Sequence, residues 1–168
     1  WGVAGLAKTE FGAARVWTQG VLECGTGFGT IDAAAMAEAS AKLVGWGYYF
    51  TGINDLTMVK AGLLANWSPD DWPLKQVLDL LRNTSVDPIH TGALAASFLA
   101  KLYVEIYLAE LRQAVHLRLL ECLLARTDAL VAIRTLKQLL PRAFGLNLPG
   151  LNEAAQLTTV WHRSRGLP

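Results

Sequence analysis

The sequence predicts a mainly α-helical protein, with a small parallel α/β element in residues 1–65 followed by a helical bundle in residues 66–168. In the first part, short runs of β-forming residues alternate with helical patterns, whereas beyond it apolar residues recur at the three- and four-residue spacing of helices. The chain has 168 residues, of which 52% are hydrophobic and 17% charged. This length and composition are typical of one folded domain covering residues 1–168.

Residues 1–29 are expected to form a helix, a strand and a helix. The first helix ends at Gly12, and the β-forming residues 13–18 then predict a short strand. A helical run follows from Gln19 to Cys24. The glycine-rich residues 25–29 are expected to break it, because glycine favours turns over helices.

Residues 32–65 are expected to continue the alternation. Asp32 is placed to cap a helix that ends at Gly45, and Glu38 and Lys42 on this helix have the spacing of an ion pair. Residues 48–51, three aromatic residues and a threonine, predict a second strand, and Asn54 is placed to cap the helix after it. These elements form the predicted α/β portion.

Everything after residue 72 is expected to be helical. The signals that start and stop helices place four helices in residues 73–82, 90–126, 127–144 and 151–163. The second is opened by Asp87 and Pro88, and the third is capped by Thr127. These four helices form the predicted bundle.

Charge and hydropathy argue against several kinds of partner. Fifteen basic and fourteen acidic residues give a net charge of +1, too balanced to predict a nucleic-acid partner from charge alone. Residues 85–168 are mildly basic, which we interpret as an ordinary solvated surface. The most apolar stretch, residues 93–111, contains Lys101, Glu105 and Glu110, so it predicts a buried helix and no membrane partner.

The cysteines predict a reducing, cytoplasmic setting. Cys24 and Cys122 lie far apart in the sequence and form neither a metal-binding nor a disulfide pattern, and no secretory segment opens the chain. Because Trp1 is not an initiator methionine, we expect that the chain began further upstream or was cut from a longer one, and that an upstream domain is among its partners.

Few residues have the spacing of a catalytic or metal site. Residues 25–29 lack the motifs of phosphate and dinucleotide loops and are expected to form a turn. His90, His116 and His162 have no second ligand three or four residues away and are expected to be core or surface side chains. Asp70 and Asp71 are adjacent carboxylates and therefore candidate metal ligands, although their place before a helix favours a capping role.

Four tryptophans are candidates for the hydrophobic core. Because tryptophan carries a large apolar ring, burial is the first interpretation, and stacking on nucleic-acid bases is the second. The residues are Trp17, Trp46, Trp67 and Trp72.

The order of several short motifs in residues 1–65 resembles the closing half of a PIN-like nuclease domain. The likeness is strongest to the PIN-like domains at the ends of long bacterial TPR-repeat proteins. The motifs that carry it are Phe11-Gly12, Val16-Trp17-Thr18-Gln19-Gly20-Val21-Leu22, Gly29-Thr30-Ile31-Asp32 and Gly47-Tyr48-Tyr49-Phe50.

This resemblance implies an α/β/α nuclease that cleaves RNA with Mg or Mn ions held by acidic residues. Thr18 matches a turn near the active-site edge of the family, but threonine alone cannot hold a metal. Where the family carries acidic residues after a strand, this chain has Gly2-Val3-Ala4-Gly5. Cleavage by this chain would therefore need carboxylates supplied from elsewhere.

Three classes of function remain open at this point. The first is a PIN-like, RNA-directed module of a bacterial toxin or defence protein that lacks a complete metal site of its own. The second is a non-catalytic helical domain for protein–protein interaction or regulation, and the third is a small-molecule-binding helical bundle. No cofactor is evident beyond Mg or Mn in the catalytic case, and the expected partners are RNA or another protein chain.

Overall fold

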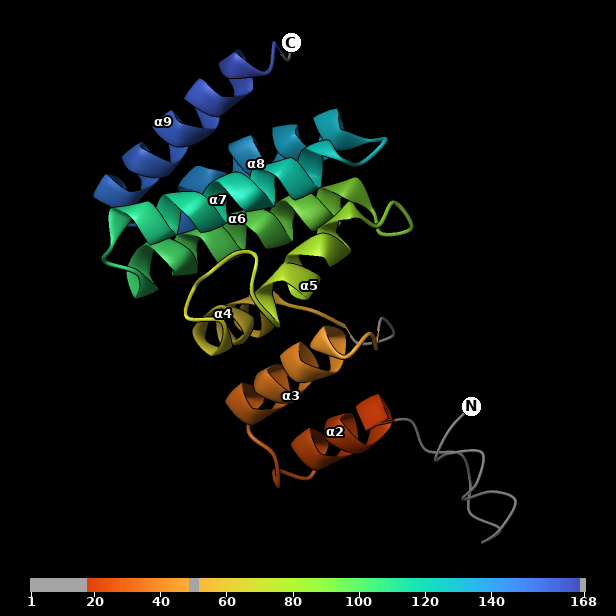
Figure 1. Cartoon of the computed structure of the whole chain (residues 1–168). Coiled ribbons are helices and arrows are strands. Elements are labelled where there is room, and N and C mark those ends of the chain that lie inside the picture. The colour runs from red at the N-terminus through yellow and green to blue at the C-terminus, as the bar shows by residue number, and fades with distance from the viewer. Residues whose placement is uncertain (1–17, 49–51, 167–168) are drawn as a thin grey trace, which may run out of the picture.

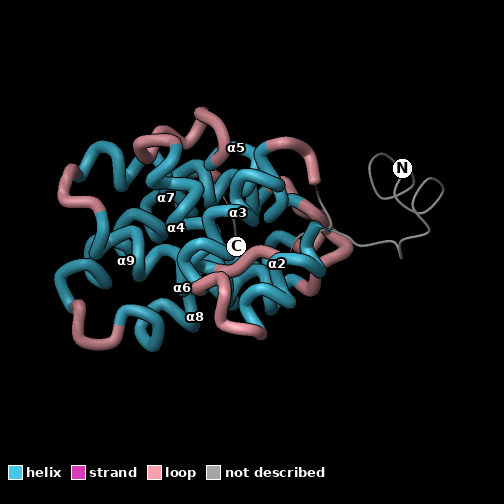
Figure 2. The backbone as a smooth tube through the Cα atoms, turned by 90° about the horizontal axis from the view of Figure 1, so that it is seen from below, coloured by secondary structure: helices cyan, strands magenta, loops and turns pink. Residues whose placement is uncertain are grey.

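The computed structural model describes residues 18–48 and 52–166, and the regular elements in these residues are helices (Figures 1 and 2). The prediction of a mainly helical protein is confirmed. The described residues form eight α-helices and one short 3-10 helix, which follow one another in a layered stack: α2 (Thr18–Gly27), α3 (Ala33–Gly45), α4 (Asp55–Leu64), α5 (Leu74–Asp79), η1 (Leu80–Arg82), α6 (Pro88–Glu105), α7 (Ala109–Leu124), α8 (Ala129–Phe144) and α9 (Leu148–Ser164).

The small α/β element expected in residues 1–65 is not seen in the part of that region that the structure describes. No strand occurs in residues 18–48 or 52–65. The strand expected over residues 13–18 falls outside the described residues except for Thr18, which instead begins α2. The strand expected over 48–51 also lies outside them except for Tyr48, which is not in a regular element.

The caps predicted for the N-terminal helices are confirmed. The Asp32 carboxylate accepts a hydrogen bond of 2.7 Å from the amide of Ala35, and the Asn54 side chain accepts one of 2.8 Å from Thr57. Glu38 and Lys42 form the expected ion pair at 2.7 Å. The glycine-rich segment differs from expectation, since α2 runs through Gly27 before the chain turns.

The long helix expected over residues 90–126 is two helices. The chain breaks after α6 at Ile106, whose backbone is extended, and α7 begins at Ala109. No glycine or proline marks this break. It is stabilised by Arg112, whose guanidinium donates a 2.8 Å hydrogen bond to the carbonyl oxygen of Ile106 and pairs with Glu153 of α9 at 2.6 Å.

The N-terminal ends of α8 and α9 also differ from expectation. Thr127 does not cap α8, because Asp128 occupies the N-cap position and its carboxylate is engaged by Arg126. Helix α9 begins at Leu148, three residues before the expected start, because the Asn147 side chain accepts a hydrogen bond from the Gly150 amide.

The core lies where α6, α7 and α8 meet, and its centre is formed by fully buried apolar side chains: Phe98, Leu99, Leu102, Leu119, Leu120, Leu123, Ile133 and Leu136. Burial of such side chains is the dominant favourable contribution to folding. Helix α9 covers one side of this core, and α4 and α5 connect it to α3 and α2 (Figure 1). Among the described residues, no helix is both long enough and apolar enough to cross a membrane.

Gly92 allows α6 to approach α8 closely, and we expect Gly92→Ala to lower the free energy of unfolding. A Cβ at this position would lie 2.5 Å from the carbonyl oxygen of Ala132 and 2.8 Å from Thr135 Cβ. Overpacking of this kind costs about 1–3 kcal/mol, more than the helix propensity that alanine gains. Urea-induced unfolding followed by circular dichroism measures the effect.

Gly20 in α2 provides the matched control, because a Cβ there would have no neighbour within 4 Å. Gly20→Ala is therefore expected to leave the unfolding midpoint unchanged or to raise it. Equal midpoints for Gly92→Ala and the wild type would show that α6 and α8 do not pack as closely as described.

Candidate functional site

The three site candidates from the sequence do not come together in space as a metal site. Thr18 is the first residue of α2, whereas Asp70 and Asp71 lie in the connection between α4 and α5. Among the described residues, no three His, Cys, Asp or Glu side chains are grouped so that they could hold a metal ion.

Asp70 and Asp71 are exposed and do not cap the following helix. The N-cap position of α5 is Pro73, and no side chain makes a capping hydrogen bond there. The capping interpretation of the two aspartates is therefore wrong. Within the part of the chain that the structure describes, neither carboxylate has a hydrogen bond or an ion pair.

His116 is confirmed as a core histidine with both ring nitrogens hydrogen-bonded. It is fully buried in α7, with Nδ1 3.0 Å from the hydroxyl of Tyr103 on α6 and Nε2 3.1 Å from Oγ1 of Thr158 on α9. Burial lowers its pKa to about 3. This polar chain joins three helices and does not reach the surface, so its role is structural.

The remaining histidines and cysteines also show no catalytic arrangement. His90 is exposed, and His162 is half-buried on α9. Cys24 is exposed on α2, whereas Cys122 is buried in α7, and both are free thiols, as the sequence predicted. Burial raises the pKa of the Cys122 thiol, which opposes a role as a nucleophile.

Of the four tryptophans considered as core candidates, one is buried and two form an exposed pair. Trp67 is buried, as expected, but Trp46 is 66% exposed and Trp72 41% exposed, so the core prediction is wrong for these two. Trp17 lies outside the described residues. The rings of Trp46 and Trp72 lie 6.2 Å apart between centroids and tilted by 33°. Tyr48, 55% exposed, lies two residues after Trp46. We call these three side chains the Trp46–Trp72 surface.

Trp46 is positioned by the end of α3. It is the C-cap residue, and its amide donates hydrogen bonds to the carbonyl oxygens of Lys42 at 3.0 Å and Leu43 at 3.1 Å. Gly47 then adopts a positive φ of 85°, which glycine accepts readily, and the Tyr48 amide donates back to Leu43. The last turn of α3 therefore presents both aromatic side chains at the surface.

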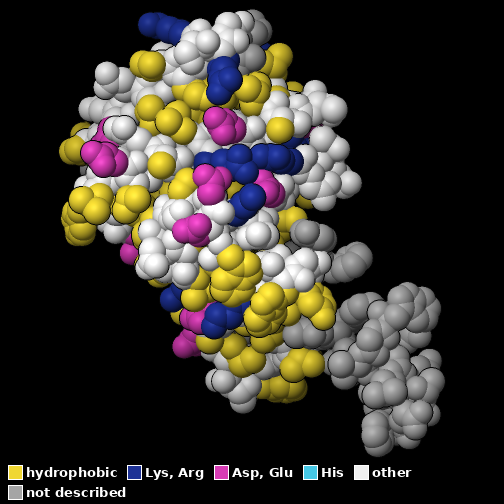
Figure 3. Space-filling view, viewed as in Figure 1, with side chains coloured by type: hydrophobic (Ala, Val, Ile, Leu, Met, Phe, Trp, Pro, Cys, Tyr) yellow, Lys and Arg dark blue, Asp and Glu magenta, His cyan; other side chains and the backbone are white. Residues whose placement is uncertain are grey.

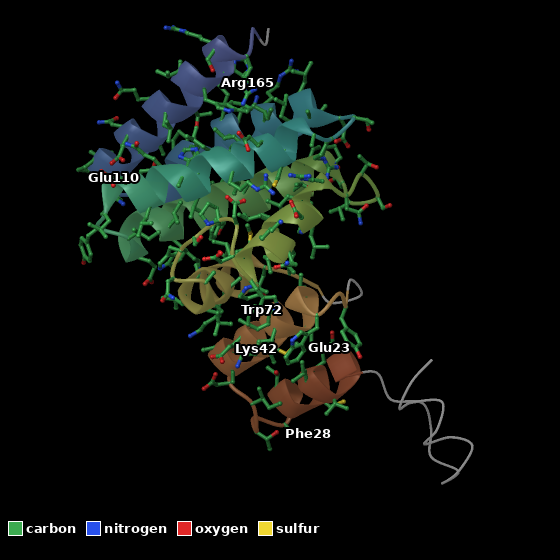
Figure 4. All side chains as sticks on the ribbon, viewed as in Figure 1. Glu23, Phe28, Lys42, Trp72, Glu110 and Arg165 are labelled. Carbon is green, nitrogen blue, oxygen red and sulfur yellow. The ribbon has the colours of Figure 1, made fainter. Side chains whose placement is uncertain are left out.

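Trp72 is held in place by the loop between α4 and α5. Asn66 and Trp67 have positive φ values of 48° and 60°, and the sharp turn they make buries the Trp67 ring over Gly62, where a Cβ would overlap it. Further along the loop, Trp72 lies against Gly45 of α3, and a Cβ on Gly45 would overlap the indole. Two glycines in helices thus make room for two indoles. Trp67 fixes the loop against α4, and Trp72, labelled in Figure 4, fixes it against α3.

The loop that carries Trp72, residues 65–73, contains two acidic residues and no basic one. Asp70 and Asp71 precede Trp72 in the same exposed loop. Lys42, on the helix that carries Trp46, is paired with Glu38. Figure 3 shows hydrophobic side chains gathered over α2 and α3, with few basic groups among them. The loop therefore carries two carboxylates next to an exposed indole in the sequence and offers no basic group of its own to phosphate.

Sequence reasoning missed this surface because exposure cannot be inferred from tryptophan alone. Gly45 and Gly62 were the available signals, since an isolated glycine in a helical pattern marks close approach of another group.

Comparison of the chain with models of protein families, with curated proteins and with solved structures found no match.

Proposed function

We propose that this chain is a non-catalytic helical domain that binds another protein through the Trp46–Trp72 surface. The observation that supports the proposal is the contact between two exposed indoles on adjoining elements. Tryptophan and tyrosine are enriched at the centres of protein interfaces, where a few such residues contribute most of the binding energy. Exposed aromatic rings are unfavourable in water, so a partner that covers them removes apolar surface from water and stabilises the complex.

The carboxylates of Asp70 and Asp71 favour a protein partner over RNA. Proteins that stack bases on aromatic rings combine the rings with a positively charged groove along the phosphate backbone. Here the exposed loop that carries Trp72 contributes two negative charges instead. A protein partner with an apolar centre and basic residues at its rim would complement this surface.

Site-specific crosslinking tests the proposal even though the partner is unidentified. A photoreactive aromatic residue replaces Trp46 in the cells that make the protein, and illumination is expected to yield one discrete adduct that protease removes and ribonuclease does not. The same residue at Tyr107, which is 92% exposed and lies between α6 and α7, is the control and should not give this adduct.

Trp72→Ala is expected to reduce the adduct formed at position 46 by at least about tenfold, since truncation of an aromatic residue at the centre of an interface costs about 2 kcal/mol or more. Tyr107→Ala should leave the yield unchanged. Equal yields from Trp72→Ala and the wild type, or an adduct that ribonuclease destroys, would refute a protein-binding role for this surface.

The PIN-like, RNA-directed function of residues 1–65 stays a prediction with its own test. A labelled single-stranded RNA is incubated with the chain and manganese, with excess chelator in a parallel sample. Cleavage that is abolished both by chelator and by the pair Asp70→Ala and Asp71→Ala would make these two carboxylates metal ligands. Absence of cleavage would exclude catalysis by this chain alone.

A further inference from the structure

A second surface follows the seam between the antiparallel helices α8 and α9. Two cavities, of about 350 and 110 Å³, lie along this seam and share Lys137 in their linings. Together they form a groove that passes from the N-terminal half of α8 to the N-terminal half of α9. We call it the α8–α9 groove and define it by Leu130, Arg134, Lys137, Pro141, Ala155 and His162.

The rim of the α8–α9 groove is cationic. Arg134 and Lys137, which both carry a positive charge at neutral pH, line its larger cavity. Over residues 129–166 the chain has five basic residues and a single acidic one, Glu153. Arg112 of α7 binds that carboxylate through hydrogen bonds of 2.6 and 2.8 Å, so it does not neutralise the rim.

The basic side chains of the rim are also unpaired. Among the described residues, neither Arg134 nor Lys137 has an ion pair, in contrast to Arg165, which contacts Glu121 at 3.5 Å. Burial, and next the positive charge of Lys137, lower the pKa of His162. The mildly basic second half of the sequence, first interpreted as ordinary solvated surface, thus has part of its charge concentrated along one seam.

The floor of the groove is apolar. Leu130, which is 46% exposed, and the buried side chain of Ile133 both line the larger cavity. Farther along, Pro141, Leu151 and Ala155 continue the apolar lining. An apolar floor with cationic edges complements a helix that has apolar residues on one face and carboxylates beside them.

The dimensions of the groove agree with such an occupant. Leu130, Arg134, Lys137 and Pro141 recur at intervals of four, three and four residues and therefore share one face of α8. At 1.5 Å per residue, this face extends for about 17 Å, which corresponds to about three turns of a partner helix.

We propose that the α8–α9 groove binds an acidic amphipathic helix of a partner protein. Leucine-type side chains of that helix contact Leu130 and Ala155, and its carboxylates pair with Arg134 and Lys137. The groove lining contains no Phe, Tyr or Trp ring on which a base could stack, which favours a peptide over single-stranded nucleic acid. This proposal does not depend on the Trp46–Trp72 surface.

Fluorescence anisotropy with the full chain tests the proposal. The probe is a labelled synthetic helix of about 14 residues, with leucines at helical spacing on one face and glutamates on both flanks. We expect it to bind, and its Kd to rise several-fold between about 50 and 300 mM salt, because salt screens the charge pairs. The same peptide with lysines in place of glutamates, and a single-stranded RNA, are the comparison ligands.

Two groove variants separate the contributions of charge and apolar contact. The double substitution Arg134→Glu and Lys137→Glu is expected to raise the Kd of the acidic peptide at least about tenfold, and Leu130→Ser is expected to raise it several-fold without any change of charge. Lys75→Glu, which reverses an exposed lysine on α5, is the matched control and should leave the Kd within about twofold.

Three outcomes would overturn the proposal. The first is equal affinity for the acidic and the lysine-containing peptides, and the second is tighter binding of the RNA than of the acidic peptide. The third is the same Kd for the wild type and the double groove variant. Circular dichroism of each variant establishes that the helices are retained, so a loss of binding reports on the groove itself.

Discussion

Replacement of Arg126 by alanine is expected to lower the free energy of unfolding by about 2–4 kcal/mol, because alanine removes several hydrogen bonds made by a buried guanidinium. The side chain of Arg126 is completely buried although it carries a positive charge. Its Nε and Nη2 contact the two carboxylate oxygens of Asp128 at 2.6 and 3.0 Å. This contact lowers the pKa of the Asp128 carboxyl.

Arg126 also binds the connection between η1 and α6. Its guanidinium donates hydrogen bonds to three carbonyl oxygens, those of Leu81 at 3.1 Å, Asn83 at 2.6 Å and Val86 at 2.7 Å. Alanine would leave these oxygens without their donor and Asp128 without its counter-charge. Each buried group that loses its partner costs about 1–3 kcal/mol, so the effect is spread over several contacts.

Urea-induced unfolding, followed by circular dichroism and tryptophan fluorescence, measures the loss. Arg126→Lys keeps the charge but not the planar fork of five donors, and it is expected to recover less than half of the stability. Arg134→Ala, an exposed arginine in α8, is the control and should change the free energy by less than about 0.5 kcal/mol. A loss below about 1 kcal/mol for Arg126→Ala would contradict the role assigned to this side chain.

The sequence predicts those parts of the fold that depend on neighbouring residues. Asp32, Asn54 and Asp87 cap the helices that follow them, because a capping side chain needs only the amides two or three residues ahead. The ion pair of Glu38 and Lys42 is local in the same way. Each of these features can be recognised within a window of a few residues.

The features that sequence reasoning missed depend on residues distant in the chain. The break between α6 and α7 is stabilised by Arg112 and by its partner Glu153, 41 residues away, and no residue at the break itself signals it. The buried Arg126 contacts a connection about 40 residues earlier. Arginine is usually exposed, so composition gives no indication of such a role.

The two candidate surfaces could not be predicted from the sequence, because they too depend on residues that are distant in the chain. Trp46, Trp67 and Trp72 are chemically identical, and only the packing of the α4–α5 connection against Gly45 and Gly62 decides which ring is buried. The α8–α9 groove needs α9 to fold back along α8, which brings His162 beside Lys137. The sequence showed a modest excess of basic residues in this region but not that they share one seam.

Acid is expected to destabilise this protein through His116, and the hydrogen-bond pattern explains why. Thr158 donates its hydroxyl proton to the carbonyl oxygen of Ala154 at 2.8 Å, so its oxygen must accept the proton of His116 Nε2. Nδ1 of His116 then accepts from the hydroxyl of Tyr103. A neutral imidazole satisfies this series of hydrogen bonds. In the charged form, Nδ1 would also carry a proton, and that proton would point at the Tyr103 hydroxyl that donates to Nδ1 in the neutral form.

The direction of the pH dependence follows from the two pKa values of His116. The pKa is about 3 in the folded protein and about 6.5 in the unfolded chain. Between these values the unfolded chain binds one more proton, so acid favours unfolding. The stability linked to His116 is fully present above pH 6.5 and falls by up to about 1.4 kcal/mol per pH unit as the pH drops toward 3.

Unfolding by urea at several pH values between about 7 and 4 tests this dependence against the variant His116→Gln. The variant is expected to be less stable than the wild type at neutral pH, but its glutamine does not titrate. The difference in unfolding free energy between the two proteins should therefore shrink steadily as the pH falls. His162→Gln is the comparison variant and should change the slope less than His116→Gln does, because His162 is only half-buried on α9. Parallel stability curves for the wild type and His116→Gln would mean that His116 does not enter the folded core as a neutral group. If the two stability curves converge as the pH falls, protonation of His116, which joins α6, α7 and α9, is the main source of acid sensitivity between pH 6.5 and 5. Few carboxylates titrate in this range.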